Sequence, residues 1–351
     1  MGHAHKFILL AALLAACGED PLPPGFGQDG DNIKGDGDGD GDGDGDGDGD
    51  GDGDGDGDGD GDSGDGDVGD GDRGDGDGDV GDGDAGDGDA GDGDAPVTPG
   101  EGPPASKLPK PKGTCSTLKD GAFTMNGATV QLTVGTKPGP VYFYFHGTGS
   151  MPSEVDQGIP GARSAVKTKG GLVATWDVSS PMGDSTGSFW EVWHTGDFDV
   201  ADQILACAIQ QKIVDTSHIH VAGYSAGGLQ TGAMVYMRSN YLASAIVYSG
   251  GKGFGAQGLQ DPSNVPSTVF AHGAMGSDMV VIDFAQQSAT MENDLKTKGF
   301  IVDCNDGGGH VQPGRLGIMG NATKFFETHG YKQNGYGSTL PGWPSTCKIV
   351  K

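Results

Sequence analysis

One short segment, Gly-Tyr-Ser-Ala-Gly-Gly at positions 223–228, restricts the fold of this chain more than any other. An apolar, β-branched run at 219–222 precedes it, and apolar residues at helical spacing over 229–237 follow it, so the sequence predicts a strand, a sharp turn and a helix. Such a turn needs glycine on both sides of the serine, because a Cβ there would collide with neighbouring backbone. Ser225 would then lie at a helix N-terminus, where N–H groups can face a developing oxyanion. This context favours a nucleophile over a plain glycine-rich turn.

The charge of the chain is concentrated in one tract. Residues 29–94 contain 29 aspartates against Lys34 and Arg73, a net charge of −27, whereas the whole chain carries −29. The remainder is therefore close to neutral and shows no basic stripe. Electrostatics gives no reason to expect a nucleic-acid partner.

Residues 1–17 indicate an export signal. Lys6 forms a short polar start, and the apolar run at 7–16 is too short to span a bilayer. The run ends Leu-Ala-Ala-Cys at 14–17, which resembles the lipobox of bacterial lipoproteins. The resemblance implies that Cys17 is acylated and anchors the protein to the bacterial cell envelope, on the outer membrane or cell surface. An ordinary secretory signal with a chance cysteine is the alternative.

The composition of residues 18–112 predicts a disordered tether. The Gly-Asp alternation buries no apolar surface and its aspartates repel one another, while the proline-rich end at 96–112 should be stiffer and polyproline-like. The segment at 36–41 matches the start of an EF-hand loop, but the twelfth position, which needs a bidentate acid, falls on Gly47. We therefore expect no defined metal site, only weak and diffuse cation binding.

The remaining residues, 113–351, amount to one domain. Strand-like and helix-like segments alternate, which predicts an α/β fold with a mainly parallel central sheet flanked by helices. Strands are predicted at 129–134, 141–145, 172–176, 218–222, 245–248, 269–272 and 300–303, and helices at 161–169, 200–211, 226–238 and 281–298.

Four cysteines besides Cys17 fit an exported protein, because an even number outside the cytoplasm favours disulfides. We predict a Cys115–Cys347 bridge that ties the two ends of the domain, and a Cys207–Cys304 bridge. Buried free thiols are the alternative. No two of these cysteines lie at the spacing of metal ligands.

A serine hydroxyl becomes a good nucleophile only when a histidine takes its proton and an acid orients that histidine. In α/β-hydrolases the three residues occur in the order Ser, Asp, His along the chain. His310 ends the flexible run Asp-Gly-Gly-Gly-His after the last predicted strand, where such a base belongs. His194 precedes the serine and His272 lies within a predicted strand, so His329 is the main alternative.

The acid should follow the predicted strand that ends at His272. Asp278 lies in that loop, whereas Asp283 falls within the predicted helix at 281–298 and Asp261 precedes the strand. Asp278 is therefore the predicted acid, and a solvated helix N-cap is its alternative role.

The oxyanion needs two N–H donors. The backbone of Ala226, directly after the serine, should supply one. The other should come from the run His-Gly-Thr-Gly at 146–149, with Thr148 as the expected donor and His146 as a structural residue.

The motifs His-Gly-Thr-Gly, Gly-Tyr-Ser-Ala-Gly-Gly, His-Gly-x4-Asp and Gly-Gly-Gly-His, in this order, resemble the secreted α/β-hydrolase-fold esterases grouped with polyhydroxybutyrate depolymerases and feruloyl or acetylxylan esterases. The resemblance covers roughly residues 120–335. It implies Ser225 as nucleophile, Asp278 as acid and His310 as base, with Thr148 and Ala226 at the oxyanion.

These patterns predict a serine esterase that needs no cofactor and acts on a small or polymeric carboxylic ester, of hydroxyalkanoate, feruloyl or acetyl-polysaccharide type. Trp190 and Trp193, in a Gly/Ser-rich segment at 179–196, are predicted to bind substrate, with local packing as the alternative role. Two other functions stay open: a serine peptidase of the same fold, and a catalytically inactive surface-binding lipoprotein.

Overall fold

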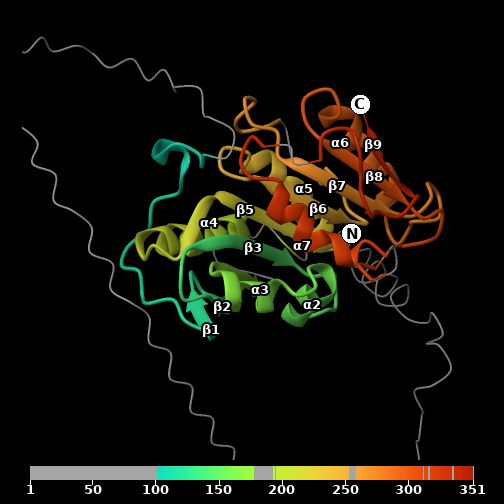
Figure 1. Cartoon of the computed structure of the whole chain (residues 1–351). Helices are drawn as coiled ribbons and strands as arrows, with labels where there is room; N and C mark the ends of the chain where they lie inside the picture. Colours follow the sequence, from blue (N-terminus) through green and yellow to red (C-terminus); the bar gives the residue numbers. More distant parts are fainter. Residues whose placement is uncertain are drawn as a thin grey trace, which may run out of the picture. The chain divides into compact units, whose positions relative to one another are not determined.

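The computed structural model describes residues 101–177, 193, 195–252, 258–310, 312–314, 317–333 and 336–350. These residues form one mixed sheet with helices on both faces (Figure 1). The predicted export signal with Cys17, and the Gly-Asp tract, lie outside the described residues.

The sheet has the strand order β1-β2-β4-β3-β5-β6-β7-β8-β9. The strands from β4 to β8 in this order are parallel, whereas β1 and β2 at one end and β9 at the other pair antiparallel. Their bounds are Gly121–Met125 (β1), Ala128–Val134 (β2), Gly139–Phe145 (β3), Leu172–Trp176 (β4), Val214–Tyr224 (β5), Ser244–Tyr248 (β6), Ser267–His272 (β7), Ile301–Asn305 (β8) and Cys347–Val350 (β9).

The helices connect these strands. Their bounds are Val155–Gly158 (α2), Ala162–Lys169 (α3), Gly196–Gln210 (α4), Ala226–Met237 (α5), Phe284–Leu295 (α6) and Met319–Thr328 (α7), with short 3₁₀ turns at Ala105–Lys107 (η1) and Pro152–Glu154 (η2). Among the described residues, no helix combines the length and the apolar character that crossing a bilayer requires.

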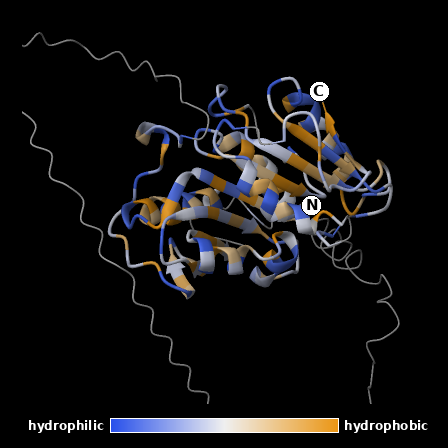
Figure 2. Cartoon of the chain, in the orientation of Figure 1, coloured by the Kyte–Doolittle hydropathy of each residue, from blue (hydrophilic) through white to orange (hydrophobic). Residues whose placement is uncertain are grey.

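Both faces of the sheet are buried, which explains why its central strands are apolar throughout. Along β3, Val141, Phe143 and Phe145 join the core beneath α4, α5 and α6. Tyr142 and Tyr144 point to the other face and join the core beneath α2, α3 and α7. Apolar residues accordingly concentrate in the strands and in the helix faces that cover them (Figure 2). The result is a three-layer α/β/α domain.

The seven predicted strands and four predicted helices are all present, with shifted ends. Sequence patterns missed β1, β9, α2 and α7. β1 is mostly exposed, and β9 has only four residues, three partly exposed and one exposed, so neither shows an apolar signal. α2 is a single turn, and the sequence of α7 contains glycine, asparagine and threonine, which are weak helix formers.

The order of the strands concentrates several loops at one edge of the sheet. Strands β4 and β5 lie on opposite sides of β3, so the direction of winding reverses between β3 and β5. In open α/β sheets, ligands bind beyond the carboxyl ends of the strands at such a switch point. The loops after β3, β5, β7 and β8 all begin at that edge.

The predicted boundary between tether and domain needs correction, because residues before 113 already pack on the domain. The Lys107 Nζ forms a 3.0 Å ion pair with Asp261, and the Lys107 carbonyl accepts a hydrogen bond from Asn240. The Lys112 N–H donates to the Gln203 side chain at 2.7 Å. We call residues 102–120 the N-terminal strap.

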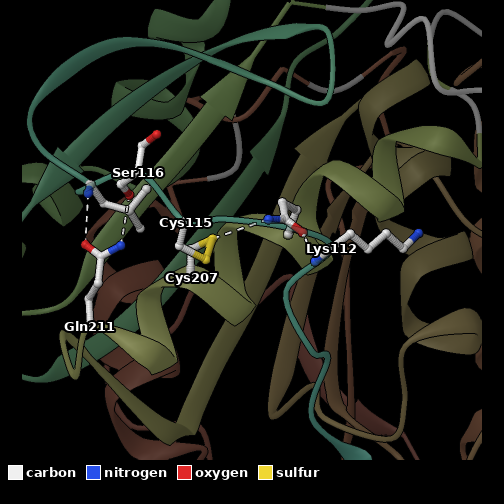
Figure 3. Close-up of a disulfide and its surroundings, with 7 residues drawn as sticks. Lys112, Cys115, Ser116, Cys207 and Gln211 are labelled. Carbon is white, nitrogen blue, oxygen red and sulfur yellow. Dashed lines mark hydrogen bonds between the residues drawn. A yellow bond between two sulfur atoms is a disulfide. The ribbon is translucent and has the colours of Figure 1, made fainter.

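The predicted disulfide pairing is wrong, although all four cysteines are bridged. Cys115 of the strap pairs with Cys207 of α4, with 5.4 Å between their Cα atoms (Figure 3). Cys304 pairs with Cys347. The physical reason is that β9 adds to the sheet beside β8, in a register that places these two residues opposite each other. The two ends of the domain are therefore each bridged to a different neighbouring element and not to each other.

Removing either bridge by paired Cys→Ser substitution should lower the free energy of unfolding. The Cys115–Cys207 bridge has a sequence separation of 92, so its loss should cost roughly 4 to 5 kcal/mol. The Cys304–Cys347 bridge, with a separation of 43, should cost about 4 kcal/mol. Urea unfolding of both double variants measures the losses. Non-reducing peptide maps that join Cys115 to Cys347 would contradict the pairing.

Candidate active site

Ser225 occupies the turn between β5 and α5 with φ +56° and ψ −119°, a conformation that side-chain-bearing residues rarely adopt. Its N–H donates to the Tyr248 carbonyl at 3.0 Å. A Cβ at Gly227 would lie 1.9 Å from the Phe145 carbonyl oxygen, and one at Gly223 would lie 2.4 Å from the Gly227 oxygen. Both glycines are therefore required where the turn packs against the end of β3, as the sequence predicts.

Asp278 lies in the loop after β7 and is completely buried. One carboxylate oxygen accepts hydrogen bonds from the Ser249 hydroxyl at 2.9 Å and from the Gly273 N–H at 3.0 Å. The other oxygen lies 2.7 Å from His310 Nδ1. The helix N-cap role belongs instead to Asp283, which accepts from the Gln286 N–H. Asp278 thus orients an imidazole.

The His310 ring is held from three sides. Besides its contact with Asp278, its centroid lies 5.1 Å from the Tyr224 ring and 4.5 Å from the Phe284 ring. Since the carboxylate accepts at Nδ1, Nδ1 carries the proton and Nε2 is left as the basic nitrogen. His310 Nε2 is buried and has no hydrogen-bond partner among the described residues.

The structure therefore brings together the predicted acid and base, and Tyr224 joins them to the turn that carries Ser225. No hydrogen bond between Ser225 and His310 is formed within the described part of the chain. Bonds between a nucleophile and its base are often long before substrate binds and tighten in the complex.

The loop after β3 lies directly against the turn at Ser225. A Cβ at Gly147 would lie 2.9 Å from the Tyr224 ring and 3.5 Å from the Ser225 Cβ. Thr148 follows, partly exposed, in a turn. Ala226 is the first residue of α5, so its N–H has no acceptor within the helix. Ala226 thus directly follows Ser225, and Gly147, the residue before Thr148, lies beside Ser225.

Glu154 braces this loop and was missed by sequence analysis. Its buried carboxylate accepts from the Gly147 N–H at 3.1 Å and from the Tyr144 hydroxyl at 2.8 Å. Burial and the Glu154 charge raise the pKa of Tyr144 well above its ordinary value, so the phenol stays a donor. A lone acid in a 3₁₀ turn gives no sequence signal, because its partners are set by tertiary packing.

Trp193 takes a core position. Its side chain is 2% exposed, its Nε1 donates to the His146 carbonyl at 2.8 Å, and its ring packs edge-on against Phe145. These contacts give Trp193 the packing role rather than the predicted substrate-binding role. Trp190 and His194 lie outside the described residues.

The alternative histidines are engaged elsewhere. His272 Nε2 is hydrogen-bonded to the Asp303 carboxylate at 3.0 Å, and its Nδ1 is hydrogen-bonded to the Gly273 carbonyl at 2.7 Å. Burial alone would lower the pKa of His272, but these hydrogen bonds raise it above its ordinary value. His329 stacks on Phe300 and Phe325, and burial lowers its pKa to about 4.

Across the described ranges, no three His, Cys, Asp or Glu side chains are grouped as a metal ion would require.

No protein-family model matches the sequence, and no curated protein sequence matches it. Solved structures do share its fold. A complex of a pOPH variant with pNPB is 15% identical, with a TM-score of 0.52 over 69% of this chain and 97% of that chain. Native sOPH is 16% identical, with a TM-score of 0.50 over 70% and 98%. An acetyl xylan esterase from Aspergillus awamori is 14% identical, with a TM-score of 0.41 over 58% and 98%. At these identities the likeness to pOPH and sOPH shows the fold alone, which is the α/β-hydrolase fold.

Glu154→Ala should lower kcat on an ester substrate by about tenfold to a hundredfold, because the loop that carries the predicted oxyanion donor Thr148 loses its buried brace. Steady-state kinetics with p-nitrophenyl acetate measures the change. Glu327→Ala is the matched control, since Glu327 lies on a helix of the outer layer, where its carboxylate forms an exposed ion pair with Lys169. Equal effects of the two substitutions would contradict the bracing role.

His329→Phe should leave activity within about twofold and change the pH dependence of stability. The ordinary histidine pKa is 6.5 and the folded pKa of His329 is about 4. Between these pH values the unfolded chain binds a proton that the folded chain does not, so stability falls as pH falls, by about 3 kcal/mol in all. Urea unfolding at pH 7 and at pH 4, relative to wild type, measures this contribution. Loss of activity in His329→Phe would restore His329 as a candidate base.

Proposed function

We propose that this protein is a serine esterase. The observation that carries the proposal is the 2.7 Å contact between His310 Nδ1 and the buried carboxylate of Asp278, beside the turn that presents Ser225. A histidine oriented by a buried acid, with its second nitrogen unpartnered, is equipped to accept a proton from a neighbouring hydroxyl.

In the proposed reaction, Ser225 Oγ attacks the ester carbonyl while His310 Nε2 takes its proton. The backbone N–H groups of Ala226 and Thr148 stabilise the oxyanion. His310 then gives the proton to the departing alcohol, and the C–O bond to that alcohol breaks, leaving an acyl-enzyme. Water, deprotonated by His310, then attacks the acyl carbonyl; the bond to Ser225 Oγ breaks, His310 returns the proton to Ser225, and the acid is released. Asp278 stabilises the imidazolium in both half-reactions.

The substrate classes proposed are hydroxyalkanoate, feruloyl and acetyl-polysaccharide esters. The structural neighbours support an esterase only through their fold. Because a pOPH variant forms a complex with pNPB, pNPB is a reasonable first compound to offer this protein.

We further propose that the protein is an exported lipoprotein, anchored through Cys17. The position of the strap indicates on which side of the domain an anchor at Cys17 would attach. A Cβ at Gly102 would lie 2.4 Å from the Thr216 hydroxyl, near the amino end of β5. Thr216 is nine residues from Ser225 along β5, or about 30 Å at the strand rise. The described chain therefore starts at the edge of the sheet opposite the candidate active site.

Ser225→Ala should abolish hydrolysis of p-nitrophenyl esters, to less than about one part in a thousand of the wild-type kcat. Asp278→Asn should lower kcat by roughly a hundredfold to ten-thousandfold, since the imidazole loses its orienting charge. Initial rates with and without each substitution provide the measurement.

Full activity in Ser225→Ala would contradict the proposal. Cleavage of peptide substrates in preference to esters would make the protein a peptidase of the same fold, and absence of any turnover would favour a binding lipoprotein.

A further inference from the structure

Large apolar side chains that face solvent lie beside the candidate active site. Within the described residues, the large hydrophobic side chains with the greatest exposure are Met151 at 60%, Met275 at 59% and Met279 at 53%. Met151 follows the loop that carries Thr148, and the other two flank Asp278 in the loop after β7. Single apolar side chains scattered over a surface need no explanation. These three methionines instead all lie in loops at the edge of the sheet that carries the candidate active site, and this grouping suggests a binding surface.

The loop after β7 adds more apolar surface. Met279, Val280, Val281 and Ile282 are consecutive, lie outside any helix or strand, and are all exposed or partly exposed. A run of four such residues in contact with water is unfavourable for folding unless it serves a binding function. We call residues 275–282 the apolar loop.

The backbone of the apolar loop is well fixed. The Asp278 N–H donates to the Ala274 carbonyl and the Phe284 N–H to the Asp278 carbonyl, each at 2.8 Å. The Gly276 N–H donates to the Asp283 side chain at 2.7 Å. The apolar side chains are therefore presented to solvent by an ordered backbone, which lowers the entropic cost of binding.

Hydrogen bonds also place this apolar surface on both sides of the site. The Ala274 N–H donates to the Gly308 carbonyl at 2.8 Å, which fixes the apolar loop beside the loop of His310. On the other side, the Met151 carbonyl accepts from the N–H of Glu154 at 2.9 Å. Glu154 in turn holds the loop of Thr148 in place.

We propose that Met151 and the apolar loop bind the aliphatic part of the ester substrate, so that the preferred substrates are esters with an extended apolar acyl chain, such as hexanoyl esters, rather than acetylated sugars. This inference rests on the proposed esterase function. Methionine side chains are flexible and polarisable, and they adapt to chains of irregular shape. Compared with an acetyl group, a longer acyl chain buries more apolar surface with each added methylene.

The test compares p-nitrophenyl hexanoate with p-nitrophenyl acetate on the full chain. Wild type should have a higher kcat/KM for the hexanoate. Changing Met151, Met275 and Met279 together to Gln should lower the hexanoate-to-acetate ratio of kcat/KM by about tenfold, while acetate hydrolysis stays within twofold. The matched triple Met→Leu variant keeps the apolar area and should keep the ratio. Thermal unfolding of both triple variants checks that each is folded.

The outcomes separate the two claims. If wild type hydrolyses acetate through Ser225 but the Gln variant keeps the wild-type ratio, the apolar surface does not bind the acyl chain and the esterase proposal stands. Equal losses on both substrates, or a wild-type preference for acetate or acetylated sugar, also overturn the inference. If wild type hydrolyses neither ester, both proposals fail.

Discussion

The candidate site depends on one buried charge. Asp278 is fully enclosed, and a carboxylate can be kept there only when its oxygens are hydrogen-bonded. Its three partners, Ser249, Gly273 and His310, follow the neighbouring strands β6, β7 and β8. The same interactions that satisfy the charge therefore hold three loops together and fix the imidazole. Removing any one partner leaves part of the charge unpaired, so folding and site geometry are coupled at this point.

A second constraint is the close approach of the Ser225 turn to the end of β3. Glycine at 223 and 227 allows that approach, and it places the loop of Gly147 within contact distance of Ser225. Glu154 then fixes the same loop from behind through its bonds to Gly147 and Tyr144. Ser225 and the expected oxyanion donors thus lie directly after two adjacent strands, on a turn and a loop that close packing and Glu154 fix, as precise chemistry requires.

The fold could be predicted, and so could the placement of Ser225, Asp278 and His310 at one edge of the sheet, because each leaves a local signal. Ser225, Asp278 and His310 each follow an apolar strand, and parallel strands bring their carboxyl ends to one edge. The disulfide partners left no such signal, since Cys347 meets Cys304 only through the register of a four-residue edge strand. Glu154 and the packing of Trp193 also depend on contacts between distant segments, which no periodicity records. The first part of the strap was predicted to be tether because its proline-rich composition is typical of a linker. Its contacts with Gln203 and Asp261 are tertiary and leave no sequence signal.

The most direct test of the central claim, that Ser225, His310 and Asp278 act as one unit, is a crystal structure of the protein after reaction with a fluorophosphonate. We expect phosphorus bonded to Ser225 Oγ, a phosphoryl oxygen accepting from the Ala226 N–H, and His310 Nε2 at hydrogen-bond distance from the adduct while Nδ1 stays on Asp278. An adduct on another residue, or one at Ser225 with His310 turned away from Asp278, would contradict it.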